Sequence, residues 1–433
     1  MATFQRAHVQ RLLGLLREDG RRRLIAITGP RQTGKTTIAR QALAALESSD
    51  IAWRYVAVDA PPEAGPELQP GDTHSWPEFR ESADAAGRAF AGQRDARWLS
   101  GIWEQARHAA ERSPGGAVLV LDEIQDIPDW SRTVKGLWDQ DQATGSPLRV
   151  VVMGSAPLQL LFGLGERLVG RFLSLPVSHW SLAEMVSAFD CSMDQYLFFG
   201  GYPAGAERWD EEDDWRSYIE DGIIQRNVER DILSMVRVDK PALLSNLLEL
   251  GSSYSGQILS YNKMLGQLQD AGNTTTLARY LQLLSGAGLL AGLAKYSSKA
   301  HRRRASSPKL NVLNTALMTA PSGYTFDEAR ADRSFWGRIV ESAVGAHLHN
   351  TRAPGVRIYY WRHNGSEVDF VLERGPRLTA IEVKTGARRR AVSGMEEFER
   401  RFKPTRTEVV GTGGVALHEF LSEPAGYWLE DRV

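Results

Sequence analysis

Three apolar runs lie between residues 24 and 153, and each is followed by a polar turn. They cover residues 24–28 (LIAIT), 117–121 (AVLVL) and 149–153 (RVVVM). Continuous apolar runs of this length are typical of strands that are buried on both faces of a parallel sheet. A helical pattern, KTTIARQALAAL, follows the first run at residues 35–46. This alternation predicts an α/β domain with a parallel sheet over residues 1–185.

The pattern of apolar positions changes after this domain. The stretch ERWDEEDDWRSYIEDGI at residues 207–223 is acidic, so we expect it to form a solvated helical linker within residues 186–242. Apolar residues then recur at helical spacing, which predicts a helical domain over residues 243–325. Short strands return near the C-terminus, which predicts a second α/β domain over residues 326–433.

Composition and charge narrow the class of protein. With 433 residues, 42% hydrophobic and 24% charged, the chain suits a soluble protein with several cores. Its formal net charge of -1 means that nucleic-acid binding would depend on local basic patches. The single cysteine, Cys191, excludes an internal disulfide and a multi-cysteine zinc site. No apolar run approaches the roughly 18–20 residues needed to span a bilayer, and the first residues lack the apolar core of a signal peptide, so we expect a cytoplasmic protein without a membrane segment.

A phosphate-binding motif follows the first apolar run. Residues 29–36, GPRQTGKT, fit G-x-x-x-x-G-K-[ST] between a predicted strand and a predicted helix. Backbone N–H groups of the loop and the helix N-terminus would bind phosphates, Lys35 would reach the β- and γ-phosphates, and the Thr36 hydroxyl would ligate Mg²⁺. The expected nucleotide-binding residues of this segment are Gly29, Pro30, Arg31, Gln32, Thr33, Gly34, Lys35, Thr36 and Thr37.

Polar residues after the other two runs complete this prediction. Asp122 would hold the Mg²⁺ shell, and Glu123 would orient a water for attack on the γ-phosphate. Ser155 follows the third run and either contacts the nucleotide or is a simple turn serine. Arg167 and Arg171 are candidates for an arginine finger that acts on a neighbouring subunit, with Arg171 preferred, and the alternative is a surface arginine on a helix. A finger acting between subunits implies a homo-oligomer.

Several segments resemble one known family. GPRQTGKTT, LDEIQDIPDW, VVVMGSAP and GRFLSLPVSHWSLAEM are similar to the AAA-type ATPase module of a bacterial and archaeal family. Its members carry this module in front of a winged helix and a C-terminal domain similar to PD-(D/E)XK nucleases. FFGGYP (198–203), RNVERDI (226–232) and SPKLNVLNTAL (307–317) resemble the family's connecting segments, so the resemblance spans nearly the whole chain. It implies nucleotide hydrolysis, and the choice of ATP over GTP rests on it. The Pro- and Gly-rich residues 59–79, an expected surface excursion, depart from the family pattern.

Residues 259–313 have the layout of a helix-turn-helix followed by a wing. Gly272 suits the turn, and Thr274 is placed to cap the second helix. The apolar stripes consist of Met264, Leu265 and Leu268 on the first helix, and Leu277, Tyr280, Leu281 and Leu284 on the second. The residues left outward on the second helix, where a recognition helix meets DNA, are Asn273, Thr275, Thr276, Arg279 and Gln282.

The expected wing loop is strongly basic. It contains Lys299, His301, Arg302, Arg303 and Arg304, and no acidic residue lies between Ala291 and Val312. Such a loop would bind DNA phosphates in a salt-dependent way. The alternative is a solvated charge run beside a winged helix that contacts proteins or serves as an ATPase lid.

Two predicted strands near the C-terminus carry a nuclease-like set of residues. Glu382 and Lys384 share one face of LTAIEVK, and Asp369 lies opposite the face formed by Val368, Phe370 and Leu372 in SEVDFVLE. Two carboxylates at a sheet edge can hold Mg²⁺, and a nearby lysine can activate the attacking water. The alternative is a pair of ordinary strands with polar faces.

The family pattern adds a glutamate from a preceding helix to this set. Glu341 fits, because it lies between Gly337 and Gly345 on a side of the helix that could approach the sheet closely. The expected metal ligands are therefore Glu341, Asp369 and Glu382, with Lys384 as the catalytic lysine. Ten Lys or Arg residues against four acids between Arg374 and Arg406 suit a nucleic-acid role, and such a domain could also keep the fold for binding without cutting.

Together these features predict a P-loop NTPase (AAA+-like) domain, a winged-helix region and a small restriction-endonuclease-like α/β domain. The hypothesis is an ATPase that uses ATP and Mg²⁺, binds DNA and couples hydrolysis to DNA remodelling or translocation, as a homo-oligomer. A second hypothesis is a nucleotide-dependent switch whose C-terminal domains bind protein partners. A third is an ATP-regulated, metal-dependent DNA nuclease.

Overall fold

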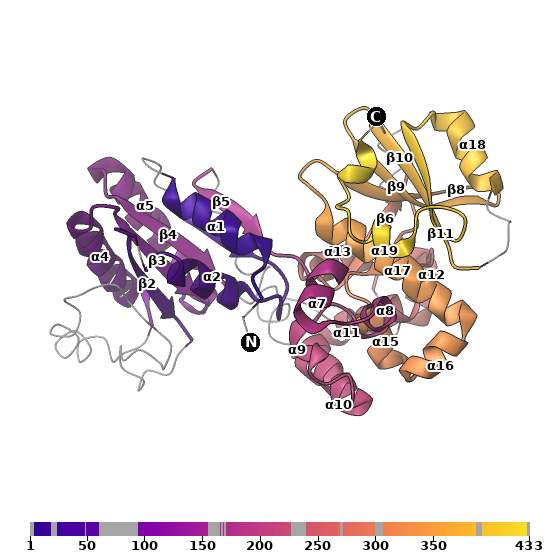
Figure 1. Ribbon diagram of the computed structural model, residues 1–433, viewed down its shortest axis with the longest axis horizontal. Helices are drawn as coiled ribbons and strands as arrows, with labels where there is room; N and C mark the ends of the chain where they lie inside the picture. The colour runs from indigo at the N-terminus through magenta and orange to yellow at the C-terminus, as the bar shows by residue number, and fades with distance from the viewer. Residues whose placement is uncertain are drawn as a thin grey trace. The chain divides into compact units, whose positions relative to one another are not determined.

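A computed structural model describes residues 4–18, 24–47, 49–59, 94–154, 165, 168, 170–226, 240–268, 272–298, 306–386 and 392–430. The chain divides into two compact units, Met1–Val177 and Ser178–Val433, each of which contains one β-sheet (Figure 1). Among the described helices, none is long and apolar enough to cross a membrane.

The first unit contains a five-stranded sheet in which every pair of neighbouring strands is parallel. The strand order is β2-β3-β4-β1-β5. The strands are β1 (Leu24–Thr28), β2 (Ala52–Ala57), β3 (Ala117–Asp122), β4 (Leu148–Met153) and β5 (Phe172–Pro176). The three predicted strands are confirmed as β1, β3 and β4. The apolar pattern missed β2 and β5, because Arg54 interrupts β2 and two central residues of β5 are exposed.

Helices cover both faces of this sheet, which explains why the central strands are apolar throughout. The helices are α1 (Ala7–Arg17), α2 (Lys35–Ala44), α4 (Ala96–Arg112), the short 3₁₀ turn η1 (Ile124–Asp126) and α5 (Trp130–Thr144). Leu12 and Ile38 pack with Val151 on one face. Trp103 and Trp138 pack with Val150 on the other face. The loop ends of β1 and β3 therefore belong to a rigid, two-sided core.

The second unit begins with a helical region and ends with a mixed α/β region. Its first helices are α7 (Leu182–Phe189), α8 (Met193–Phe199), α9 (Pro203–Ala206), α10 (Glu212–Ser217), the π-helix η2 (Tyr218–Gln225), α11 (Pro241–Ser253), α12 (Tyr261–Gln267) and α13 (Thr274–Gly286). Its later helices are α15 (Ala316–Thr319), η4 (Ala320–Ser322), α16 (Phe326–Ala331), α17 (Arg333–Thr351), α18 (Val392–Phe402), α19 (Leu417–Phe420) and η5 (Tyr427–Leu429).

The acidic segment at residues 207–223 is not the solvated linker that its composition predicted. Trp215, Ile219 and Ile223 in α10 and η2 have no exposed side-chain surface. Trp215 packs against Phe198 and Phe199 of α8, with ring centroids 5.6 Å and 4.9 Å away. The acids lie on the outer side of a packed helical element, and its apolar residues stabilise the second unit.

A six-stranded sheet joins the expected wing to the C-terminal strands. Its order is β11-β10-β9-β8-β6-β7. The strands are β6 (Leu290–Lys295), β7 (Lys309–Val312), β8 (Arg357–His363), β9 (Ser366–Arg374), β10 (Arg377–Lys384) and β11 (Arg406–Gly411). β6 and β7 form an antiparallel pair, and Ala294 of β6 pairs in parallel with Tyr359 of β8. Residues 243–325 and 326–433 therefore lie in one compact unit.

The division between the two units falls after Val177, eight residues before the boundary expected at 185. The segment that follows is attached to the second unit. His179 Nε2 lies 2.8 Å from the Gly288 carbonyl oxygen, and its Nδ1 lies 3.3 Å from Asn314 Nδ2. These buried contacts explain why residues 178–185 pack with the C-terminal part of the chain.

Candidate functional site

The phosphate-binding motif forms a tight loop between β1 and α2. Gly29, Gln32 and Gly34 have φ values of 150°, 60° and 86°, and helix α2 begins directly at Lys35. A Cβ on Gly29 would lie 1.9 Å from the Val177 carbonyl oxygen, so only glycine fits there. Lys35 is buried, and its Nζ donates to the carbonyl oxygens of Gly29 (3.0 Å) and Pro30 (2.7 Å). The lysine is thus held against the loop that would bind phosphates.

Thr36 and Asp122, the expected magnesium ligands, are brought together. Thr36 Oγ1 donates to Asp122 Oδ2 at 2.9 Å, and the Glu123 N–H donates to Asp122 Oδ1 at 3.0 Å. Burial raises the pKa of the Asp122 carboxyl, and its hydrogen bonds partly oppose that shift. A hydroxyl and a carboxylate are oxygen donors of the kind that Mg²⁺ prefers, so these residues fit the ion.

Sequence reasoning missed Tyr55 in this site. Tyr55 belongs to β2, which pairs with β3, and its hydroxyl donates to Asp122 Oδ2 at 2.5 Å. Burial and the neighbouring Asp122 raise the pKa of the tyrosine well above its usual value, so it remains a donor. The Arg40 guanidinium lies over the Tyr55 ring, 4.9 Å from its centroid. No local signal marked this residue, because its role depends on the pairing of β2 with β3.

Gln125 is a second residue that the sequence did not single out. Its Nε2 donates to Glu123 Oε2, and Glu123 has a left-handed backbone with φ of 54°. A Cβ on Gly154, at the end of β4, would lie 2.0 Å from Gln125 Oε1. Gln125 therefore packs against the end of β4 and holds the Glu123 carboxylate. The spacing in LDEIQD was the only available signal.

Three other residues were predicted to act at the nucleotide. Ser155 and Arg167 lie outside the described residues. Arg171 is on the surface of the first unit, and its Nε donates to Asp139 Oδ1 of α5 at 2.8 Å. The exposed position leaves Arg171 accessible, while the ion pair with Asp139 holds its side chain along α5.

The expected helix-turn-helix corresponds to α12 and α13. Gly272 has φ of 70°, as a turn glycine should, but Asn273 caps α13 in place of Thr274. Asn273 Oδ1 accepts from the Thr276 N–H at 2.9 Å, and Asn is among the best N-cap residues. The predicted stripe, Leu277, Tyr280, Leu281 and Leu284, is buried. In the first helix Met264 is buried and Leu265 is half-buried, and Leu268, the residue that follows the helix, is buried.

The residues expected to face DNA are only partly described. Thr275, Arg279 and Gln282 are exposed on α13, and Thr276 is half-buried. Arg302, Arg303 and Arg304 lie outside the described residues, as do Lys299 and His301. In the described part of this region, the exposed face of α13 therefore carries one charged residue, Arg279, beside Thr275 and Gln282.

Three carboxylates of the second unit lie within 4.0 Å of one buried lysine. Lys309 of β7 has no exposed side-chain surface. Its Nζ lies 2.6 Å from Glu341 Oε1, 3.2 Å from Asp369 Oδ1 and 4.0 Å from Glu367 Oε1. Glu382 belongs to the same electrostatic group. The predicted acids thus come together, and no local sequence pattern pointed to Lys309 or Glu367. The segment of Lys309, SPKLNVLNTAL (307–317), showed only a resemblance to a connecting segment of the family.

Close packing of α17 and a β-bulge position these acids. A Cβ on Gly337 would lie 3.1 Å from Thr385 Oγ1, and one on Gly345 would lie 2.8 Å from the Phe370 ring, so the predicted close approach is confirmed. Tyr359 pairs with Val371 but Trp361 pairs with Val368, so β9 contains one extra residue near Asp369.

The bulge corrects the predicted alternation in β9. Val368 joins the apolar cluster that contains Val371, instead of sharing a regular face with Phe370 and Leu372. All four of these apolar side chains are buried, so the bulge changes their direction and not their burial. It also turns Asp369, whose Oδ2 accepts from the Val383 N–H at 2.9 Å. Bulges commonly redirect a functional side chain in this way.

The charges in this cluster are strongly coupled. Burial and the neighbouring Asp369 raise the pKa of Glu382 to about 9 and that of Glu341 to about 7. Burial opposes the charged form of Lys309, but Asp369 and Glu341 outweigh it and raise the pKa of the ammonium above its usual value. The lysine is therefore charged.

This arrangement does not fit the expected metal site. Among the residues that the structure describes, no group of three or more His, Cys, Asp and Glu side chains is arranged to hold a metal ion. Glu341 and Asp369 instead direct an oxygen each toward the Lys309 ammonium. The arrangement therefore does not support the expectation that Glu341, Asp369 and Glu382 are metal ligands, because Lys309 of β7 is paired with two of them, Glu341 and Asp369.

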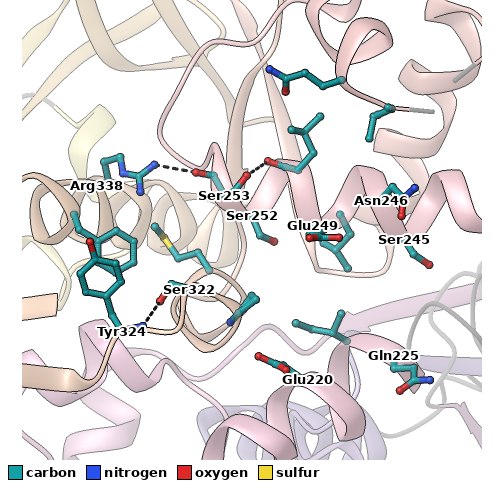
Figure 2. A pocket seen from close by; sticks show the side chains of 18 of the residues that line it. Glu220, Gln225, Ser245, Asn246, Glu249, Ser252, Ser253, Ser322, Tyr324 and Arg338 are labelled. Carbon is teal, nitrogen blue, oxygen red and sulfur yellow. Dashed lines mark hydrogen bonds between the residues drawn. The ribbon is translucent and has the colours of Figure 1, made fainter. Parts of the chain in front are cut away.

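The second unit also contains a cavity of about 1180 Å³. Figure 2 shows Glu220 and Gln225 of η2 on one side, and Ser245, Asn246 and Glu249 of α11 across from them. Arg338 lines the cavity as well, but its Nη1 donates to the Ser253 carbonyl oxygen at 2.9 Å. The lining is mixed and weakly acidic, and it includes no described residue that the sequence assigned to nucleotide, metal or DNA.

Three parts of the chain match known family models. Residues 21–186 match a model described as an AAA domain. Residues 191–328 and 336–420 match two models described as domains of unknown function, DUF8612 and DUF4143. No curated protein matches the chain.

Solved structures that are similar to the chain share little sequence with it. The ORC1 protein of Aeropyrum pernix in complex with DNA is 15% identical, with 76% of this chain and 95% of that chain covered and a TM-score of 0.32. The RuvB Holliday junction branch migration motor of Thermotoga maritima is 16% identical, with 66% and 89% covered and a TM-score of 0.30. AMPPCP-bound DnaA from Aquifex aeolicus is 14% identical, with 64% and 85% covered and a TM-score of 0.30. Such low TM-scores do not establish a shared arrangement of whole chains.

Proposed function

We propose that the chain hydrolyses ATP with Mg²⁺ and couples this hydrolysis to remodelling or translocation of DNA. The match of residues 21–186 to an AAA domain supports the ATPase part. The observation that carries the ATPase part is the contact between Thr36 Oγ1 and Asp122 Oδ2, 2.9 Å apart at the head of α2. It places a P-loop hydroxyl and a strand-end carboxylate together, as a phosphate-bound magnesium ion requires.

Each residue of the nucleotide site has a distinct part in this mechanism. Thr36 and Asp122 would hold Mg²⁺, which neutralises charge that develops on the phosphates. Lys35 exchanges its bonds to the Gly29 and Pro30 carbonyl oxygens for phosphate oxygens. Glu123, held by Gln125, orients and polarises the attacking water. Tyr55 keeps Asp122 in place through its hydroxyl.

The DNA part of the proposal rests on the second unit. Thr275, Arg279 and Gln282 form an exposed face on α13, which follows the turn at Gly272 as a recognition helix would. The basic residues 302–304 would add phosphate contacts and a strong dependence on salt. An oligomer would let Arg171 leave Asp139 and reach the nucleotide of a neighbouring subunit.

ATP turnover with and without duplex, single-stranded and four-way-junction DNA tests this proposal. We expect DNA to raise the rate, Lys35→Ala to abolish it, and Arg279→Glu to weaken DNA binding at low salt. Arg97→Glu, an exposed arginine on α4, is the matched control. If DNA neither changes the rate of ATP turnover nor binds to the protein at low salt, the DNA part of the proposal is wrong. That result would favour a nucleotide-dependent switch with protein partners. A Lys35→Ala protein that still hydrolyses ATP would sink the ATPase part.

A further inference from the structure

The carboxylate cluster of the second unit has no part in the function proposed above. Its central feature is a buried ammonium with three carboxylates within 4.0 Å. We infer that Lys309 is the resident cation of this cluster, so that the cluster binds no divalent metal ion and cuts no DNA by a metal-dependent route. Lys309 then has a structural role, because its ion pairs connect β7 to Glu341 of α17 and to Asp369 of β9.

The distances support a lysine in place of a metal ion. Lys309 Nζ lies 2.6 Å from Glu341 Oε1 and 3.2 Å from Asp369 Oδ1, which are ion-pair distances, and it donates to Asp369 Oδ1. A magnesium ion needs the same oxygens at roughly 2.0–2.1 Å in an octahedron. The ammonium would then lie next to a doubly charged ion in a buried place, which strong like-charge repulsion opposes.

Burial and several contacts hold the Lys309 side chain in the cluster. Its side chain is fully buried, its Nζ also lies 3.3 Å from the Asp369 main-chain oxygen, and it sits 5.0 Å from the centroid of the Phe370 ring. Its strand, β7, is paired along its length with β6 from Leu290↔Val312 to Leu293↔Lys309. The ammonium is therefore held on the inner side of the cluster, while the side chains of Glu341, Glu367 and Asp369 stay 22%, 36% and 14% exposed.

The remaining carboxylate oxygens do not make a second metal site. Asp369 Oδ2 accepts from the Val383 N–H at 2.9 Å, so both oxygens of Asp369 are occupied. Glu382 Oε2 is buried without a hydrogen-bond partner, and among the described residues no three His, Cys, Asp or Glu side chains are arranged to hold a metal ion. Glu367 lies at the edge of the group, 4.0 Å from the ammonium.

Counting bound Mn²⁺ on the full-length, nucleotide-free chain by electron paramagnetic resonance tests this inference. Every protein carries Asp122→Asn, so that the nucleotide site contributes nothing to the count. We expect no bound ion in the chain with native Lys309. In Lys309→Met we expect one ion per chain, which disappears when Asp369→Asn is added. The count does not depend on ATP turnover, so it can fail independently of the proposed function.

Two results would overturn the inference. One is Mn²⁺ bound to the chain with native Lys309 and lost in Asp369→Asn. The other is a Lys309→Met protein with native circular dichroism that binds no ion. If Lys309→Met does not fold, the inference is still tested by comparing the number of Mn²⁺ ions bound by the chain with native Lys309 in the presence and absence of Asp369→Asn. Equal counts support the inference, and a lower count in Asp369→Asn refutes it. DNA incubated with the same proteins and Mn²⁺ should stay uncut unless Lys309 is replaced.

Discussion

Replacement of Lys309 by methionine should destabilise the second unit more than any other single lysine substitution near the cluster. The side chain keeps its length and packing, so the loss is of charge and not of volume. Lys309 Nζ has three carboxylates within 4.0 Å and no contact with solvent. Removing one partner of a buried ion pair leaves an uncompensated charge and costs about 3–5 kcal/mol. Lys384→Met, which removes a half-buried lysine, should cost under about 1 kcal/mol.

Native-state hydrogen exchange of the full chain measures this loss locally. Peptides from β7 and β9 should exchange faster in Lys309→Met, while peptides from β1 in the first unit should not change. Adding Glu341→Gln should recover part of the loss, because removal of both partners of a buried pair is often neutral. A loss in Lys309→Met no larger than that in Lys384→Met would refute the reasoning, since it would mean that the ammonium does not hold the cluster.

Three further predictions concern other sites. Tyr55→Phe removes a hydrogen-bond donor to Asp122, and a hydrogen bond to a charged group is worth about 1.5–3 kcal/mol. Steady-state ATP turnover should therefore fall by on the order of 10-fold or more. An unchanged rate would contradict the role assigned to Tyr55. Asn273→Ala should lower the stability of α13 by about 1 kcal/mol in hydrogen exchange, whereas Thr274→Ala should have little effect. Glu382→Gln should stabilise the second unit, with a gain in melting temperature that grows as pH rises from 5 to 9. The reason is that the folded pKa near 9 lies above the unfolded value, and the charged form is therefore disfavoured in the fold; a gain that shrinks with rising pH would contradict it.

The sequence by itself determined the elements whose signals are local. β1, β3 and β4 are buried on both faces, so their apolar runs needed no knowledge of their neighbours. The phosphate loop was equally clear, because its glycines, Lys35 and Thr36 are contiguous and act through backbone geometry. The stripe of α13 was predicted correctly for the same reason, since helical periodicity is a local property.

Local patterns failed where burial depends on a distant partner. The acidic stretch of α10 and η2 has the composition of a solvated linker, but Trp215 is fully buried against Phe198 and Phe199. The strand β2 was hidden by Arg54, which is tolerated because its guanidinium donates to Gln105 of α4 at 2.8 Å. In both segments tertiary contacts outweighed the intrinsic preference of the residues.

The chemistry of the carboxylate cluster was decided by the tertiary structure alone. The sequence indicated that Glu341, Asp369 and Glu382 meet, and its pattern favoured a metal ion between them. Lys309 lies 60 positions before Asp369 in the chain, and only the sheet that joins β7 to β8 and β9 through β6 brings its ammonium there. The fold decides which strand lies beside the buried carboxylates, and here it is β7, which carries Lys309. No pattern within one segment records that choice.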